Sequence, residues 1–109
     1  MKKIDRDDSK VIERYWIELD QLEKWLSDAP KDERGTLKFK NTKSITESLR
    51  KLYETFDDDL KTIIRMRYWD VDACNEWEEV ADQLFISRAK TLRMRDRLLF
   101  KTCEAIGWV

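Results

Sequence analysis

Turn-forming residues are scarce in this chain: its 109 residues include two glycines, Gly35 and Gly107, and one proline, Pro30. Glycine and proline are the residues that most often interrupt helices and build tight turns. Apolar residues recur three and four positions apart over most of the sequence, and residues that favour helix are common. We therefore predict an all-α fold of about five helices.

The first helix is expected to begin at Asp8 or Ser9 and to end at Ser27. Residues 28–43 lack a helical period and contain the proline and the first glycine, so we expect a loop there. Two apolar residues of this loop are expected to pack on the core, Leu37 and Phe39.

Capping signals predict where the next helices begin. Ser44 and Asn75 each stand three residues before a glutamate, the spacing of a capping box, and are expected to cap the second and fourth helices. The three aspartates at 57–59 precede the third helix, expected over residues 60–69. Carboxylates accept hydrogen bonds from the free amides of a helix N-terminus, which explains the triplet better than a catalytic or metal-binding role does.

Composition excludes several kinds of chemistry. The chain has no histidine, so it cannot build a Ser-His or Cys-His nucleophile pair or a His-ligated metal site. Its glycines are too sparse for a phosphate-binding loop. Cys74 and Cys103 form no CxxC motif and fit reduced thiols. We expect no enzyme activity, no cofactor and no metal site, and no apolar run reaches the ~20 residues that span a bilayer.

Charge is balanced in total but sorted along the sequence, with 22 basic and 23 acidic residues. Residues 70–82 carry six acids and no base, whereas residues 86–101 carry six bases and one acid. A strongly basic helix in a neutral protein is typical of a surface that binds a polyanion. It is also compatible with a merely solvated face.

The basic segment lies in a pattern typical of a helix-turn-helix. A small residue, Ala81, stands where two helices would cross, residues 84–86 form a tight turn, and Ser87 caps a helix that is expected to continue to Ile106. The expected core residues of the motif are Trp77, Val80, Ala81, Leu84, Ile86, Thr91 and Met94. The expected DNA-binding residues are Ser87, Arg88, Ala89, Lys90, Arg93, Arg95, Arg97 and Lys101.

Helical geometry separates two of these basic residues. At 100° per residue, Arg93 lies near the centre of the face opposite Thr91 and is expected to reach base edges. Lys101 lies two turns further on and is expected to reach only phosphate. Four to six phosphate contacts are expected in all.

Residues 60–106 resemble the region-four domain of bacterial sigma factors. In that family, a leucine-rich helix ending in R-x-R-Y precedes an acidic helix of the form (L/W)-E-E-(I/V)-(A/G), and L-x-(I/V)-S-R then leads into a basic helix. This sequence reads IIRMRYW at 63–69, WEEVA at 77–81 and LFISR at 84–88. The C-terminal AIGWV and the short length are similar to sigma-like regulators of prophages, of the RinA and ArpU types, which activate late, packaging or lysis genes.

Two positions depart from the family pattern. Phe85 stands where the family usually has glycine, at a position that often needs a positive φ, so we expect either a distorted turn or a Phe85 that packing holds in place. Thr91 replaces an aliphatic residue, which is expected to weaken the packing of the basic helix slightly.

The resemblance implies a sequence-specific DNA-binding regulator of transcription in the cytoplasm of a bacterial host. Residues 60–109 would form the helix-turn-helix part and residues 1–59 an N-terminal helical part of one compact domain, with double-stranded DNA and RNA polymerase as partners. Two alternatives stay open: a small-terminase-like DNA-packaging protein, which would form large rings, and an adaptor that binds RNA polymerase or another protein and no DNA.

Two tryptophans bear on self-association. Trp16 and Trp25 are nine residues apart, so on one straight helix they point in opposite directions. We expect one of them to lie in a partner interface or under the segment 28–43. A homodimer formed through residues 9–27 is predicted on this basis.

Overall fold

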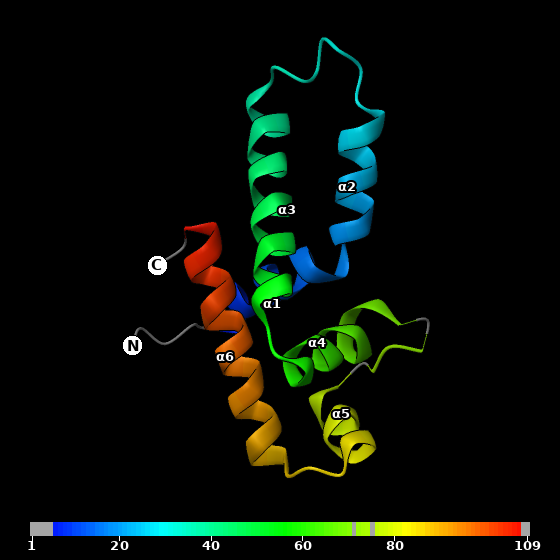
Figure 1. Cartoon of the computed structure of the whole chain (residues 1–109), viewed down its shortest axis with the longest axis vertical. Helices are drawn as coiled ribbons and strands as arrows, with labels where there is room; N and C mark the ends of the chain where they lie inside the picture. Colours follow the sequence, from blue (N-terminus) through cyan, green and yellow to red (C-terminus); the bar gives the residue numbers. More distant parts are fainter. Residues whose placement is uncertain (1–5, 71, 75, 108–109) are drawn as a thin grey trace.

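The computed structural model describes residues 6–70, 72–74 and 76–107, and these form six α-helices, one short π-helix and no strand (Figure 1). The elements are α1 (Arg6–Ile17), α2 (Leu19–Asp28), α3 (Leu37–Thr55), α4 (Asp58–Ile64), the π-helix η1 (Arg65–Trp69), α5 (Trp77–Leu84) and α6 (Arg88–Ile106). The prediction of an all-α fold is confirmed. The predicted helix cap at Asn75 and the C-terminal residues Trp108 and Val109 lie outside the described residues.

The prediction of one straight helix up to Ser27 is wrong, because α1 and α2 are separated at Glu18, where φ is −95° and ψ is 4°. The two helices have different neighbours: α1 packs on α6 and η1, whereas α2 packs on α3. Apolar residues three and four positions apart fit both helices equally well, so the sequence period contains no signal for the break.

The predicted loop over residues 28–43 is also wrong in its second half. Thr36 caps α3, and its hydroxyl oxygen accepts a hydrogen bond from the amide of Phe39 at 3.2 Å. The helix therefore begins at Leu37 and not at Ser44. Leu37 is 74% exposed, so it does not pack on the core as expected. This end of α3 projects beyond the body of the molecule, and a segment with little to bury carries no apolar stripe.

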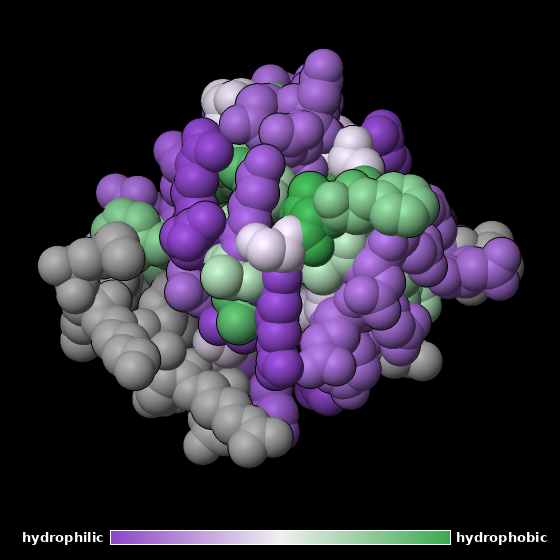
Figure 2. All heavy atoms as spheres, turned by 90° about the horizontal axis from the view of Figure 1, so that it is seen from below, coloured by the Kyte–Doolittle hydropathy of each residue, from purple (hydrophilic) through white to green (hydrophobic). Residues whose placement is uncertain are grey.

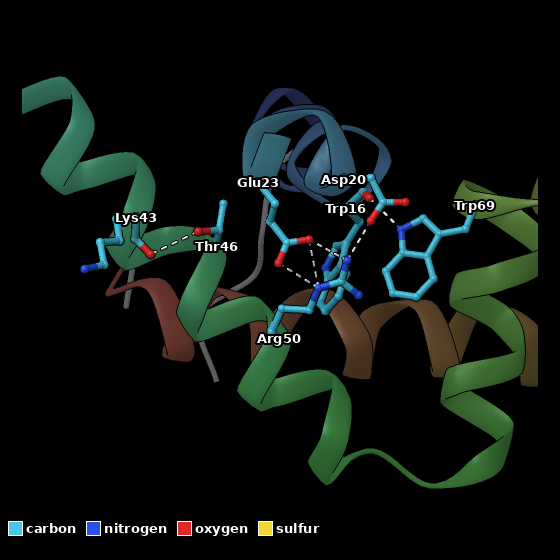
Figure 3. Close-up of polar contacts among 7 residues, drawn as sticks. All are labelled: Trp16, Asp20, Glu23, Lys43, Thr46, Arg50 and Trp69. Carbon is cyan, nitrogen blue, oxygen red and sulfur yellow. Dashed lines mark hydrogen bonds and ion pairs between the residues drawn. The ribbon is translucent and has the colours of Figure 1, made fainter. Parts of the chain in front are cut away.

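The helices α2 and α3 form an antiparallel hairpin at one end of the molecule (Figure 1). Arg50 of α3 connects them: its Nε donates to both carboxylate oxygens of Glu23 at 3.0 Å, and its Nη2 donates to Asp20 at 2.6 Å (Figure 3). Nearer the tip, the ring of Trp25 packs against that of Phe39, with centroids 6.1 Å apart. A bidentate arginine–carboxylate contact combines energy with fixed geometry, which suits a two-helix projection with little core of its own.

The main core forms where α1, the start of α2, α3, α4, η1 and α6 meet. Its buried members are Trp16, Leu19, Leu49, Phe56, Leu60, Ile64, Tyr68 and Leu98. Asp57 caps α4 as predicted, because its carboxylate accepts from the amide of Leu60 at 2.9 Å. The predicted single helix over residues 60–69 differs from the structure, since α4 already begins at Asp58 and gives way to η1 at Arg65. The end of α6 is also as predicted: Gly107 has φ of 84°, and its amide donates to the carbonyl of Cys103.

Trp16 lies at the centre of this core and has no exposed surface. Its indole Nε1 donates to the hydroxyl of Thr102 in α6 at 3.0 Å. Its carbonyl, in the last turn of α1, accepts from Nε1 of Trp69 in η1 at 2.8 Å (Figure 3). The last carbonyls of a helix lack partners within it, so this indole satisfies a group that would otherwise need water. One residue thus joins α1 to both α6 and η1.

The structure decides between the two environments expected for the tryptophans. Trp16 is in the core, and Trp25 packs against Phe39 and lies 5.0 Å from the ammonium of Lys38, both of which belong to the segment 28–43. Both rings have partners within the chain, so their positions give no independent support to a homodimer through residues 9–27. The dimer itself stays a prediction.

The buried Trp16–Thr102 hydrogen bond should contribute measurably to stability. Thr102→Val removes the acceptor and keeps the side-chain shape, so we expect the free energy of unfolding to fall by about 1–3 kcal/mol, the cost of an unsatisfied buried donor. Thr46→Val is the matched control, since Thr46 is equally buried but its hydroxyl donates only to the nearby carbonyl of Lys43. Equal losses in the two variants, measured by urea unfolding, would contradict this account.

Candidate nucleic-acid interface

The segments predicted as a helix-turn-helix are α5 and the first half of α6, joined by residues 85–87 (Figure 1). Val80, Ala81 and Thr91 are buried where the two helices meet. The other expected core residues, Trp77, Leu84, Ile86 and Met94, are half-buried. Val80 also packs with Ile63 of α4 and with Cys74, so α5 is attached to the body of the molecule as well as to α6.

The start of α6 is fixed by Ser87. Its hydroxyl oxygen accepts from the amide of Lys90 at 3.1 Å, which makes it the N-cap that the sequence predicts. Its carbonyl accepts from the hydroxyl of Thr91 at 3.0 Å. Thr91 can therefore be fully buried where the resemblance would place an aliphatic residue, because its polar atom has a local partner.

The turn between the helices is a left-handed cap at Phe85, with φ of 55° and ψ of 40°. The amide of Ile86 donates to the carbonyl of Ala81 at 3.1 Å, and that of Phe85 donates to Asp82 at 3.3 Å, a pair of bonds typical of a Schellman motif. The turn thus has regular hydrogen bonding. The expectation that packing holds Phe85 is wrong, because its side chain is 95% exposed.

Most of the basic residues of α6 lie on its exposed surface. Arg88, Ala89, Lys90, Arg93 and Arg97 are exposed, and Arg95 and Lys101 are half-buried. Figure 2 views the end of the molecule that carries the turn, and hydrophilic side chains cover most of it around a small apolar strip. Further along α6, Arg93, Arg97 and Lys101 line one open hollow together with Phe100 and two acids, Asp96 and Glu104. The three cations outnumber the acids there, and beside the aromatic ring they can contact a polyanion with both charge and ring surface.

Three of these bases already face a carboxylate. Arg88 lies 2.9 Å from Glu78 in the first turn of α5, and Arg97 lies 3.2 Å from Asp57, the cap of α4. Arg95 pairs with its neighbour Asp96 at 2.9 Å. The two partners from other helices, Glu78 and Asp57, were not predicted from the sequence, since no spacing in the sequence links residue 57 to residue 97.

The pKa of Asp57 reports the same surroundings. The hydrogen bond from the amide of Leu60 is the largest cause that lowers this pKa below its ordinary value, and the nearby guanidinium of Arg97 and ammonium of Lys101 lower it further. Asp57 is therefore ionised at neutral pH, both as a helix cap and as a counter-charge to α6.

A second polar cluster, which was also not predicted from the sequence, connects α5 to η1 and α1. Arg67 of η1 lies 3.7 Å from Glu13 of α1, and its Nη1 donates to the carbonyl of Cys74 at 3.1 Å. The hydroxyl of Tyr68 donates to the same glutamate at 2.7 Å, and burial, followed by this carboxylate, raises the pKa of Tyr68 well above its usual value. The guanidinium of Arg67 also lies 5.6 Å from the ring centroid of Trp77, which begins α5.

Other kinds of site find little support in the part of the chain that the structure describes. It contains no group of residues suited to hold a metal ion, and no helix there has the length and apolar character needed to cross a membrane. Cys74 and Cys103 are free thiols, and burial raises the pKa of each. The chain matches no protein-family model, no curated protein and no solved structure.

The left-handed backbone conformation of Phe85 should lower the free energy of unfolding. A side chain with a Cβ is strained by about 1–2 kcal/mol in the left-handed conformation, and the exposed ring gains nothing in return. We expect Phe85→Gly to be about 1 kcal/mol more stable than Phe85→Ala, which removes the ring but keeps the Cβ. Thermal unfolding of both variants measures the difference. A glycine variant no more stable than the alanine variant would show that the turn is not strained.

Proposed function

We propose that this chain is a sequence-specific regulator of transcription that binds double-stranded DNA through the first half of α6. One observation carries the proposal: the exposed bases Lys90, Arg93 and Arg97 lie on the side of α6 away from the buried Thr91 and Leu98. A capped helix with one buried face and one basic, exposed face fits the dimensions of the major groove of duplex DNA.

The remaining residues of the interface take complementary roles in this proposal. Arg93 is exposed at the centre of the outer face, where an arginine can form two hydrogen bonds with guanine. Arg88 and Lys90 lie in the first turn, beside free backbone amides that favour phosphate. Lys101 is half-buried further along α6 and is suited to a phosphate contact alone.

The motifs IIRMRYW, WEEVA and LFISR extend the proposal to a biological setting. Their resemblance to sigma region four supports a sigma-like regulator of late, packaging or lysis genes of a prophage, acting in the bacterial cytoplasm and contacting RNA polymerase. Genomic footprinting with the tagged protein tests this setting, because it reports the binding site and the neighbouring genes together.

Binding to DNA should weaken steeply as salt rises, because basic residues that contact phosphates release condensed counterions. The measurement is fluorescence anisotropy of a labelled duplex titrated with the protein at several salt concentrations. Binding that is strong at low salt and falls linearly on a log–log plot is expected. No binding at low salt would remove the proposal and favour an adaptor that contacts only proteins.

Two variants can distinguish recognition of the DNA sequence from attraction by charge alone. Arg93→Ala should reduce the affinity for the footprinted site by about 1–3 kcal/mol more than the affinity for random duplex DNA, because a base contact carries sequence information. Lys101→Ala is the matched control and should weaken both affinities alike. The quantity to compare is the ratio of the two affinities at fixed salt. An unchanged ratio in Arg93→Ala would mean that Arg93 of α6 does not recognise the DNA sequence.

A further inference from the structure

Half of the six bases between residues 88 and 101 are already neutralised within the chain. The pairs are Arg88 with Glu78, Arg95 with Asp96 and Arg97 with Asp57. Lys90, Arg93 and Lys101 form no ion pair with another residue that the structure describes. The charge that a polyanion meets on α6 is therefore smaller than the sequence suggests.

Two of the three carboxylates come from outside α6. Glu78 stands in the first turn of α5 and Asp57 at the cap of α4, so two other helices each direct one acid toward α6. Both pairs are exposed by half or more, and exposed ion pairs contribute at most about 1 kcal/mol to folding. Breaking these pairs would therefore change the stability of the fold little.

Phosphate must compete with these carboxylates for the same guanidinium groups. An arginine that turns to a phosphate leaves its former partner a few ångströms from the DNA backbone, where two negative charges repel each other. The net gain from that contact is then smaller than for an arginine that has no carboxylate partner. The repulsion acts on every DNA sequence alike, because phosphates are the same everywhere.

We propose that Asp57 and Glu78 restrain the binding of α6 to random-sequence DNA by competing with phosphate for Arg97 and Arg88. This inference rests on the proposed function. The two acids act as specificity-determining residues, because they lower the phosphate contribution and leave the base contact of Arg93 as a larger share of the binding energy. Of the three bases without a carboxylate partner, Arg93 is assigned to a base edge, which leaves Lys90 and Lys101 for phosphate. The log–log salt slope of the unaltered protein should therefore be about −2.

The chemistry of the two acids allows a test that preserves the fold. Asn is as good an N-cap as Asp, so Asp57→Asn keeps the acceptor for the amide of Leu60 and removes the charge. Glu78→Gln likewise keeps the size and polarity of the side chain. The control is the double variant Asp32→Asn with Glu33→Gln, which changes the net charge equally in the exposed turn between α2 and α3, at the opposite end of the molecule (Figure 1).

The experiment compares the unaltered protein, the Asp57→Asn/Glu78→Gln variant and the control on a labelled random-sequence duplex. At about 0.1 M salt we expect the first double variant to bind at least about tenfold more tightly than the control, with a salt slope steeper by about two. Elution from immobilised heparin, a polyanion without bases, should also move to higher salt. Circular dichroism melting confirms that all three proteins are folded.

Every other outcome contradicts either the competition with phosphate or the proposed function. If the unaltered protein binds DNA and the two double variants bind with the same affinity and slope, the carboxylates do not compete with phosphate and the inference is wrong. Weaker binding by Asp57→Asn/Glu78→Gln would mean that the acids orient the arginines toward DNA, which also overturns it. If none of the proteins binds DNA but the first variant still elutes later from heparin, the proposed function fails while the competition for α6 is upheld.

Discussion

The buried indole of Trp16 is the contact on which the arrangement of these helices depends. The ring fills the centre of the core and donates a hydrogen bond to Thr102 of α6. The backbone carbonyl of the same residue accepts a hydrogen bond from Trp69 of η1. Hydrogen bonds in a dry core are directional and costly to leave unmade, so they set how α6 lies against α1 as well as how strongly it binds there. The orientation of the basic face is thus decided by a residue some distance from it.

The nearly buried cluster of Glu13, Arg67 and Tyr68 plays the corresponding part for α5. Arg67 pairs with Glu13, bonds to the carbonyl of Cys74 and lies against Trp77, which starts α5. Removing one member of such a cluster leaves a charge without its partner, whereas breaking an exposed pair such as Arg88–Glu78 changes the stability of the fold little. The molecule thus combines fixed charges beneath the helices with exposed ion pairs on their outer surface.

Features with a local signal were predictable from the sequence. The Ser87 cap, the acidic cap of α4 and the glycine that ends α6 each depend on residues within one turn of the helix concerned. The break at Glu18 was missed, because it depends on which neighbour each helix packs against. The early start of α3 was missed, because its first turns project from the body of the molecule and carry no apolar stripe. Within the candidate site, the buried and exposed sides of α6 followed from helical spacing. The carboxylates of Asp57 and Glu78 did not, since tertiary packing brings them to α6.

The continuity of α6 has a mechanical consequence. Its 19 residues form a rod about 28 Å long whose far half is clamped by Leu99 and Cys103 against Ile12 and packs beside α3, while its near half carries the bases. A straight helix bends little without breaking backbone hydrogen bonds. The near half packs on α5 through the buried Thr91, Val80 and Ala81, so a displacement of the far half is passed on to α5 as well. The two helices therefore move as one rigid body, and the basic face keeps its shape when its position changes.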